Sequence, residues 1–242
     1  MSDLFTVVIA VDDKHLDELQ ISLPTWIKFK EFDKYPFIVI YDADQLHPAD
    51  DRFEIFKNLN VEYVAWRSMI DAYQTQREKM LTALTVLPGN LVKTPWYLKI
   101  DTDCVATDNQ KWFDESWLKK DYVFITNKWG STKPANAIEL LDKWAINKFP
   151  GIKPLNLPYN MADGKINHKR IISWLFLCKT EWSKKMSEYL YSEEDRYYRL
   201  PSISDSEYKV SQDTILWYLA TLHNYKFKLF NFKQKGWNHI KI

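Results

Sequence analysis

Short apolar runs alternate along the chain with longer stretches in which apolar residues recur every three or four positions. The short runs are rich in β-branched and aromatic residues and predict strands, whereas the periodic stretches predict helices. The predicted strands cover residues 4–11, 37–41, 61–66, 96–100, 122–126, 173–178 and 226–232. The predicted helices cover residues 14–29, 52–59, 71–87, 137–149, 181–191 and 212–222. This alternation is typical of βαβ units, so we expect an α/β fold with a mixed, mainly parallel sheet flanked by helices.

Proline, glycine and polar stretches mark the boundaries expected between these elements. Pro24 is expected to break the first helix, and Pro88-Gly89-Asn90 to stop the long third helix. Two loops and a closing turn are predicted from polar composition, at 150–169, 192–209 and 236–239. The chain has no internal repeat and no linker, and 242 residues suit one large α/β domain better than two small ones.

Acidic residues stand where three of the predicted strands end. They are Asp12 after the first strand, Asp42 and Asp44 after the second, and Asp101 and Asp103 after the fourth. In open parallel sheets, ligands bind outside the carboxyl ends of the strands. We therefore expect a binding site at this edge of the sheet.

Asp101 and Asp103 form a D-x-D motif. Their spacing places both side chains on one side of the chain if the extended conformation continues past the strand. Two carboxylates can hold Mg²⁺ or Mn²⁺ and leave coordination positions open for diphosphate oxygens. An EF-hand is excluded, because Val105 and Ala106 stand where its loop needs an oxygen ligand and a glycine. An ordinary acidic turn after a strand is the alternative explanation of the pair.

Several other ways of binding phosphate or performing catalysis are excluded by the sequence. Glycine is scarce, with 5 residues, and none follows the first strand, so the dinucleotide-binding fingerprint is absent. There is no P-loop, no G-x-S-x-G turn and no cysteine pair with the spacing of a zinc site. Phosphate binding by this fold would therefore depend on a metal ion and side chains.

Charge and cysteine content narrow the class of protein further. The 33 basic and 32 acidic residues are mixed along the chain, which argues against a nucleic-acid partner. The only cysteines are Cys104 and Cys178, and there is no N-glycosylation sequon, signal peptide or apolar run long enough to span a bilayer. We therefore expect a cytoplasmic protein that has no transmembrane segment.

The strand that ends at Asp12 and the Trp96-Tyr-Leu-Lys-Ile-Asp-Thr-Asp103 sequence resemble GT-A glycosyltransferases, which use nucleotide-sugar donors. The resemblance covers about the first half of the chain. It implies one GT-A domain over residues 1–242, with a nucleotide-binding half at 1–105 and an acceptor-binding half at 106–242. It also implies a set of donor-binding residues, namely Ala10, Val11, Asp12, Asp42, Asp44, Thr102 and either Arg77 or Lys79.

Simpler structural roles are the alternatives for part of this set. Asp42 and Asp44 would suit a solvated turn. Arg77 and Lys79 would suit an exposed helix face beside Glu78.

The resemblance implies two further functional residues in the second half of the chain. His239 would be a third metal ligand beside Asp101 and Asp103, and an imidazole in the set favours Mn²⁺ over Mg²⁺. Asp213, at the start of a late helix, would be the base that deprotonates the acceptor in an inverting reaction. A carboxylate there also suits an ordinary helix cap, in which case a retaining reaction stays possible.

The function that the resemblance implies is transfer of a sugar to a hydroxyl acceptor, such as a carbohydrate, with a UDP-sugar favoured as donor. The segments 129–136 and 155–169 would line the acceptor site, and Trp129 and Trp174 would stack against a sugar. Two alternatives stay open. One is a metal-dependent nucleotidyltransferase, against which the missing glycine-rich triphosphate loop counts. The other is a non-catalytic module that binds carbohydrate or nucleotide.

Overall fold

The computed structural model describes residues 4–41, 51–65, 87–127, 129–155, 165–170, 174–190 and 212–240. Within these ranges only the backbone is described at 129–137, 165–170, 187–190, 212 and 213.

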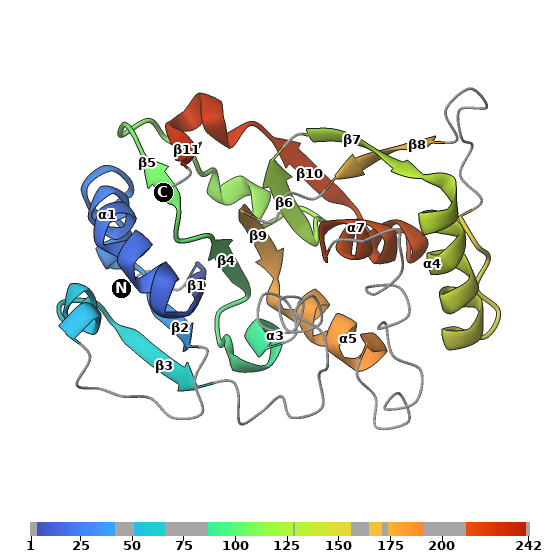
Figure 1. Ribbon diagram of the computed structural model, residues 1–242, viewed down its shortest axis with the longest axis horizontal. Helices are drawn as coiled ribbons and strands as arrows, with labels where there is room; N and C mark the ends of the chain where they lie inside the picture. The colour runs from blue at the N-terminus through green and yellow to red at the C-terminus, as the bar shows by residue number, and fades with distance from the viewer. Residues whose placement is uncertain are drawn as a thin grey trace.

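A seven-stranded sheet forms the centre of the fold (Figure 1). Its strands, in spatial order, are β10 (Phe227–Phe230), β6 (Phe124–Asn127), β9 (Leu175–Lys179), β4 (Trp96–Ile100), β1 (Thr6–Val11), β2 (Phe37–Tyr41) and β3 (Val61–Ala65). Only β9 runs antiparallel to its neighbours, β4 and β6, and the remaining pairs within the sheet are parallel. This confirms the mixed, mainly parallel sheet expected from the sequence.

Five α-helices lie among the described residues: α1 (Asp13–Lys30), α3 (Leu87–Leu91), α4 (Ala135–Lys148), α5 (Thr180–Leu190) and α7 (Gln212–Leu222). Short 3-10 turns lie at Phe32–Lys34, Asp51–Phe56, Glu115–Trp117 and Phe232–Lys235. None of the helices in the described ranges is both long and apolar enough to cross a membrane.

The sheet is buried on both faces, which is why its central strands are almost continuously apolar. Side chains alternate along β1, so that Val8 belongs to the core cluster that holds apolar residues of α3, α4, α5 and α7. Val7 and Ile9 belong to the opposite cluster, which holds the apolar side of α1. Helices thus cover both faces of the sheet and leave the strand ends to carry polar residues.

Helix α1 is continuous, so the expected break at Pro24 is wrong. Pro24 lies inside the helix and is exposed, and only one backbone hydrogen bond is lost at its missing N–H. Burial of Leu23 and Trp26 on the core side keeps the helix together across it. The helix ends instead at Lys30, and the next residue, Glu31, caps it in a left-handed conformation and donates its N–H to the carbonyl of Ile27.

The expected helix stop at Pro88-Gly89-Asn90 is also wrong, because all three residues belong to α3. Proline is tolerated in the first turn of a helix, where its N–H would have no partner. Residues 71–86 of the predicted long helix lie outside the described residues. The predicted helix at 52–59 is a 3-10 turn, Asp51–Phe56.

Two small antiparallel sheets stand where the sequence predicts loops or turns. The pair β7 (Trp129–Pro134) and β8 (Lys165–Arg170) takes in part of the predicted loop 150–169. The pair β5 (Cys104–Ala106) and β11 (Trp237–His239) replaces the predicted closing turn. The three-residue strands β5 and β11 carry little periodic pattern, and both pairs join segments that are far apart in sequence.

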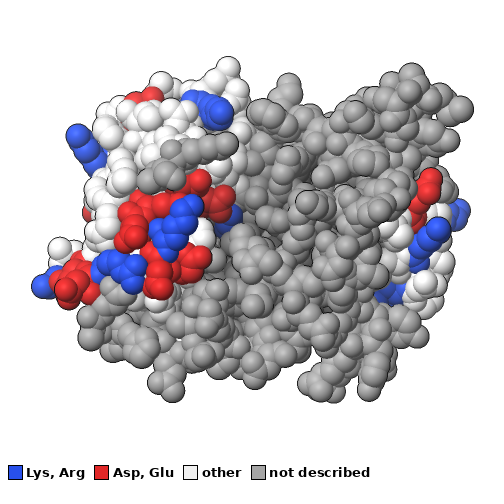
Figure 2. Space-filling view, viewed as in Figure 1, with Lys and Arg blue, Asp and Glu red and all other residues white. Residues whose placement is uncertain are grey.

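Acidic side chains gather on the surface over α1 and the turn Asp51–Phe56, with a few basic side chains among them (Figure 2). Arg52 lies 3.0 Å from Asp13 and 3.7 Å from Asp17, and Lys57 lies 3.3 Å from Glu54. The basic side chains on this part of the described surface are paired with acidic ones and form no continuous basic area of the kind that binds nucleic acid.

Candidate active site

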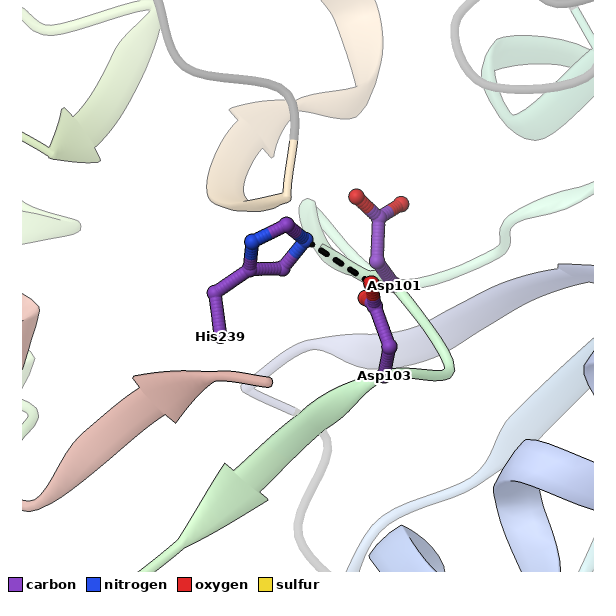
Figure 3. Close-up of side chains that lie close together, drawn as sticks. All are labelled: Asp101, Asp103 and His239. Carbon is purple, nitrogen blue, oxygen red and sulfur yellow. Dashed lines mark ion pairs between the residues drawn. The ribbon is translucent and has the colours of Figure 1, made fainter. Parts of the chain in front are cut away.

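Asp101, Asp103 and His239 meet at the carboxyl edge of the main sheet (Figure 3). One ligand atom from each residue lies within 4.8 Å of the other two. Nε2 of His239 is 3.0 Å from Oδ2 of Asp103. The sequence predicted these three residues as metal ligands, and the fold brings them together.

The arrangement of the three side chains depends on how β5 and β11 pair. His239 stands opposite Cys104, the residue that follows Asp103, in the antiparallel register of these strands. The N–H of Ile240 also donates to the carbonyl of Asp103, at 2.9 Å. Gly236, just before β11, has a φ of 73° and lies so close to Asp108 that a Cβ atom there would be 2.1 Å from Oδ1. A glycine is therefore needed for β11 to reach this position.

A turn, and not an extended strand, places Asp101 and Asp103 on the same centre. The chain leaves β4 at Asp101, whose N–H donates to the carbonyl of Trp174 at 2.8 Å. The N–H of Cys104 then donates back to the carbonyl of Asp101 at 3.1 Å and closes the turn. The condition of continued extension past the strand is not met, yet the turn still brings the two carboxylates together.

The two carboxylates have different surroundings. Lys99, which is 1% exposed, donates from Nζ to Oδ1 of Asp101. Oδ1 of Asp103 is buried and has no hydrogen-bond partner among the described residues. Burial raises the pKa of Asp103, the charge of His239 opposes the rise, and the charges of Asp101 and Glu18 add to it. A buried carboxylate oxygen without a donor, beside a second carboxylate and an imidazole, fits a divalent cation.

Trp174 supports the histidine of the triad. The rings of Trp174 and His239 are stacked, with centroids 6.0 Å apart and planes at 28°. Trp174 is only 8% exposed, and its carbonyl accepts hydrogen bonds from Asp101 N and Cys104 Sγ. It therefore offers little free face to a sugar, contrary to the stacking role expected from the sequence. The side chain of Trp129 is not described.

The residues predicted at the end of the first strand lie beside the triad. Ala10 and Val11 end β1, which runs parallel to β4 with Val8 opposite Lys99. Asp12 caps helix α1, because its side chain accepts a hydrogen bond from the N–H of His15 at 2.9 Å. These positions suit a ligand at the strand ends, and their contact with a nucleotide stays a prediction.

The remaining predicted residues are only partly described. Asp42, Asp44, Arg77 and Lys79 lie outside the described residues. Asp213 is the second residue of α7, and its side chain is not described.

Two buried charged residues near the triad were missed from the sequence. Lys99 is a single charge within the buried strand Trp96–Ile100, and a charge in such a strand needs a nearby partner. Glu18 is 5% exposed on α1, and its Oε2 accepts a hydrogen bond from the hydroxyl of Thr102. Because that hydroxyl is engaged and Thr102 is 2% exposed, the predicted nucleotide contact of Thr102 would fall to its backbone.

Comparison with known proteins identifies the fold. No protein-family model and no curated protein matches the sequence. Among solved structures, the chain is similar to the Mn/GDP form of core-mannan synthase A from Aspergillus fumigatus, with a TM-score of 0.60 and 10% identity over 98% of this chain and 74% of that one. It is also similar to the mannosyltransferase Ktr4p from S. cerevisiae in complex with GDP (TM-score 0.55, 12% identity, 98% and 71% covered).

A third similar structure is the galactosyltransferase LgtC in complex with donor and acceptor sugar analogs, with a TM-score of 0.51 and 13% identity over 88% of this chain and 70% of that one. In another structure of Ktr4p the chain spans 62% of the length. These proteins share the sheet flanked by helices, and they are glycosyltransferases. The chain therefore has the GT-A fold of glycosyltransferases, with an Asp-Asp-His triad at the carboxyl edge of its main sheet.

Proposed function

We propose that the protein is a metal-dependent glycosyltransferase that moves a sugar from a nucleoside-diphosphate donor to a hydroxyl acceptor. The observation that carries the proposal is the convergence of Asp101, Asp103 and His239 at the strand ends of a GT-A fold. The neighbours of known structure that contain GDP support a nucleotide-sugar donor. A UDP-sugar stays the donor favoured by the sequence, and a GDP-sugar is the alternative to test beside it.

The triad would hold Mn²⁺, or less favourably Mg²⁺, through the two carboxylates and Nε2 of His239. When bound, the ion neutralises charge that develops on the departing nucleoside diphosphate. Lys99 holds Asp101 by Oδ1, so that its other oxygen is left for coordination. Trp174 fixes the plane of the His239 ring by stacking.

Transfer requires a base that takes the proton of the acceptor, and we assign this to Asp213. The bond between the anomeric carbon and the diphosphate oxygen breaks, a bond to the acceptor oxygen forms, and the acceptor proton passes to the Asp213 carboxylate. The helix dipole at the start of α7 favours the ionised form that a base needs. Residues 1–105 would bind the donor and residues 106–242 the acceptor, within one domain.

The proposal is tested by calorimetric titration of UDP and GDP into the protein, with and without Mn²⁺. We expect one nucleotide to bind only with the metal, and Asp103→Asn to lose this binding because a carboxylate ligand is removed. Asp33→Asn, at an exposed aspartate outside the triad, is the matched control and should bind normally. Nucleotide binding that ignores both the metal and Asp103→Asn would contradict the metal-dependent site.

Product analysis separates the enzyme classes. A glycosyltransferase releases a nucleoside diphosphate, a nucleotidyltransferase releases pyrophosphate, and a non-catalytic module releases neither. Asp213→Asn should lower kcat by roughly 100- to 10,000-fold, the range for loss of a general base. Retention of the anomeric configuration, measured by NMR of the first product, would overturn the assignment of Asp213.

A further inference from the structure

One side of helix α1 follows the segment that contains the D-x-D motif. The side chains of Thr25, Trp26 and Lys30 each bind a backbone atom of that segment. Thr25 Oγ1 accepts from Ala106 N at 2.9 Å, Trp26 Nε1 donates to Cys104 O at 2.6 Å, and Lys30 Nζ donates to Gln110 O at 3.1 Å. The helix therefore holds the chain at several points after β4.

Glu18 extends this row of contacts to the motif itself. Glu18 is 5% exposed and Thr102 is 2% exposed, so their hydrogen bond is shielded from water. The second oxygen of Glu18 lies 3.2 Å from Nζ of Lys14. A buried carboxylate costs free energy unless it is paired, and here both oxygens have partners.

Thr102 is the residue between the two carboxylate ligands, in the turn that makes them converge. A shift of Thr102 would move the backbone on which both Asp101 and Asp103 stand. The side chain of Glu18 makes no hydrogen bond to either ligand, so its effect on their position would pass through the Thr102 hydroxyl, in addition to the negative charge that it places near Asp103. Such outer contacts orient ligands, and their loss typically lowers metal affinity about 10- to 100-fold.

We infer that Glu18, acting through the Thr102 hydroxyl, is a positioning residue that holds Asp101 and Asp103 in the geometry required for the metal. The inference rests on the metal centre of the proposed function. It adds that metal affinity depends on a residue of α1 that lies outside the ligand set.

The test is calorimetric titration of Mn²⁺ alone, with thermal unfolding measured in parallel. Thr102→Val keeps the shape of the side chain and removes the hydroxyl, and we expect it to raise the Kd for Mn²⁺ about 10-fold or more. Thr102→Ser restores the hydroxyl and should bring the Kd back near that of the unmodified protein. Glu18→Met should weaken Mn²⁺ binding at least as much as Thr102→Val, because it also removes a negative charge near Asp103.

The matched control is Thr6→Val, which removes a buried hydroxyl that is bonded to Thr94 at the opposite end of β1. It should lower the melting temperature and leave the Kd for Mn²⁺ unchanged. A Thr102→Val protein that also loses stability but keeps its Mn²⁺ affinity would reduce the contact to packing and overturn the inference. If the unmodified protein itself binds no Mn²⁺, the proposed metal centre is wrong. If the unmodified protein binds Mn²⁺ and Thr102→Val binds it equally well, only the positioning role of Glu18 is wrong.

Discussion

At the scale of single residues, buried charges are concentrated around the segment after β4. Glu18, Lys30 and Lys99 are each at most 5% exposed, and each binds an atom of Asp101, Thr102 or the loop that follows. Burial lowers the pKa of Lys30, while the nearby charge of Asp108 opposes that effect. Burying three charges costs free energy that apolar residues would not cost. All three have partners in residues 101–110, the segment that carries two of the proposed metal ligands.

His223, which is remote from the triad, leads us to expect that the free energy of unfolding depends on pH. His223 is half-buried against the rings of Phe149 and Tyr225, and burial lowers its pKa. Below a pH of about 6.5, the unfolded chain therefore takes up this proton more readily than the folded protein. We expect the free energy of unfolding to fall as the pH drops below that value.

Urea unfolding at pH 7.5 and 5.5 measures this effect. The substitution His223→Gln removes the titrating group, so part of the decline should disappear. Equal declines in the unmodified and substituted proteins would show that other groups cause it.

At the scale of elements, the sequence pattern was sufficient for long or fully buried segments. The strand at 96–100 and the helix at 212–222 have the predicted bounds, because the first is a short, almost continuous apolar run and the second a longer apolar stretch. The strands β5 and β11 were missed, since three residues give no period and their pairing is long-range. Pro88 and Gly89 were misjudged because packing outweighed local propensity.

The close packing around Gly89 predicts that replacing this residue lowers stability. A Cβ atom at Gly89 would lie 2.7 Å from both the backbone nitrogen of Lys184 and Oγ of Ser183, so α3 and α5 are in close contact there. Backbone atoms of α5 cannot yield without moving the helix. Gly89→Ala should therefore cost about 1–3 kcal/mol, the range for overpacking.

Denaturant unfolding measures the loss of free energy of unfolding in Gly89→Ala. Lys93→Ala, at a nearby exposed residue, is the control. The control should change the free energy of unfolding by less than about 0.5 kcal/mol. A neutral Gly89→Ala would mean that α3 and α5 can separate without loss.

At the scale of the whole molecule, the candidate site joins parts of the chain that are distant in sequence. Asp101 and Asp103 follow β4, and His239 is the last residue of β11. The carboxylate pair was predictable from its place at a strand end, and His239 was predicted only through the resemblance to GT-A enzymes. The supporting contacts of Glu18, Lys99 and Trp174 were not predictable, since they depend on which side of α1 and which loop meet the turn.

A metal ion bound at the triad would link these distant segments and stabilise the folded state. With free Mn²⁺ at 100 times its Kd, binding adds about 2.7 kcal/mol to the free energy of unfolding. For a chain of this size, that raises the melting temperature by roughly 5–11 °C. EDTA should reverse the rise, and Asp103→Asn should abolish it. A similar rise in Asp103→Asn, measured by calorimetry, would place the stabilising ion elsewhere.

The position of β9 has a consequence for biosynthesis. This strand separates β4 from β6, yet it follows β4 by about 75 residues. At ribosomal speeds of 5–20 residues per second, the nascent chain displays one side of β4 without its final partner for roughly 4–15 s. Exposed strand edges invite pairing with other chains, so this interval is when chaperones would matter most.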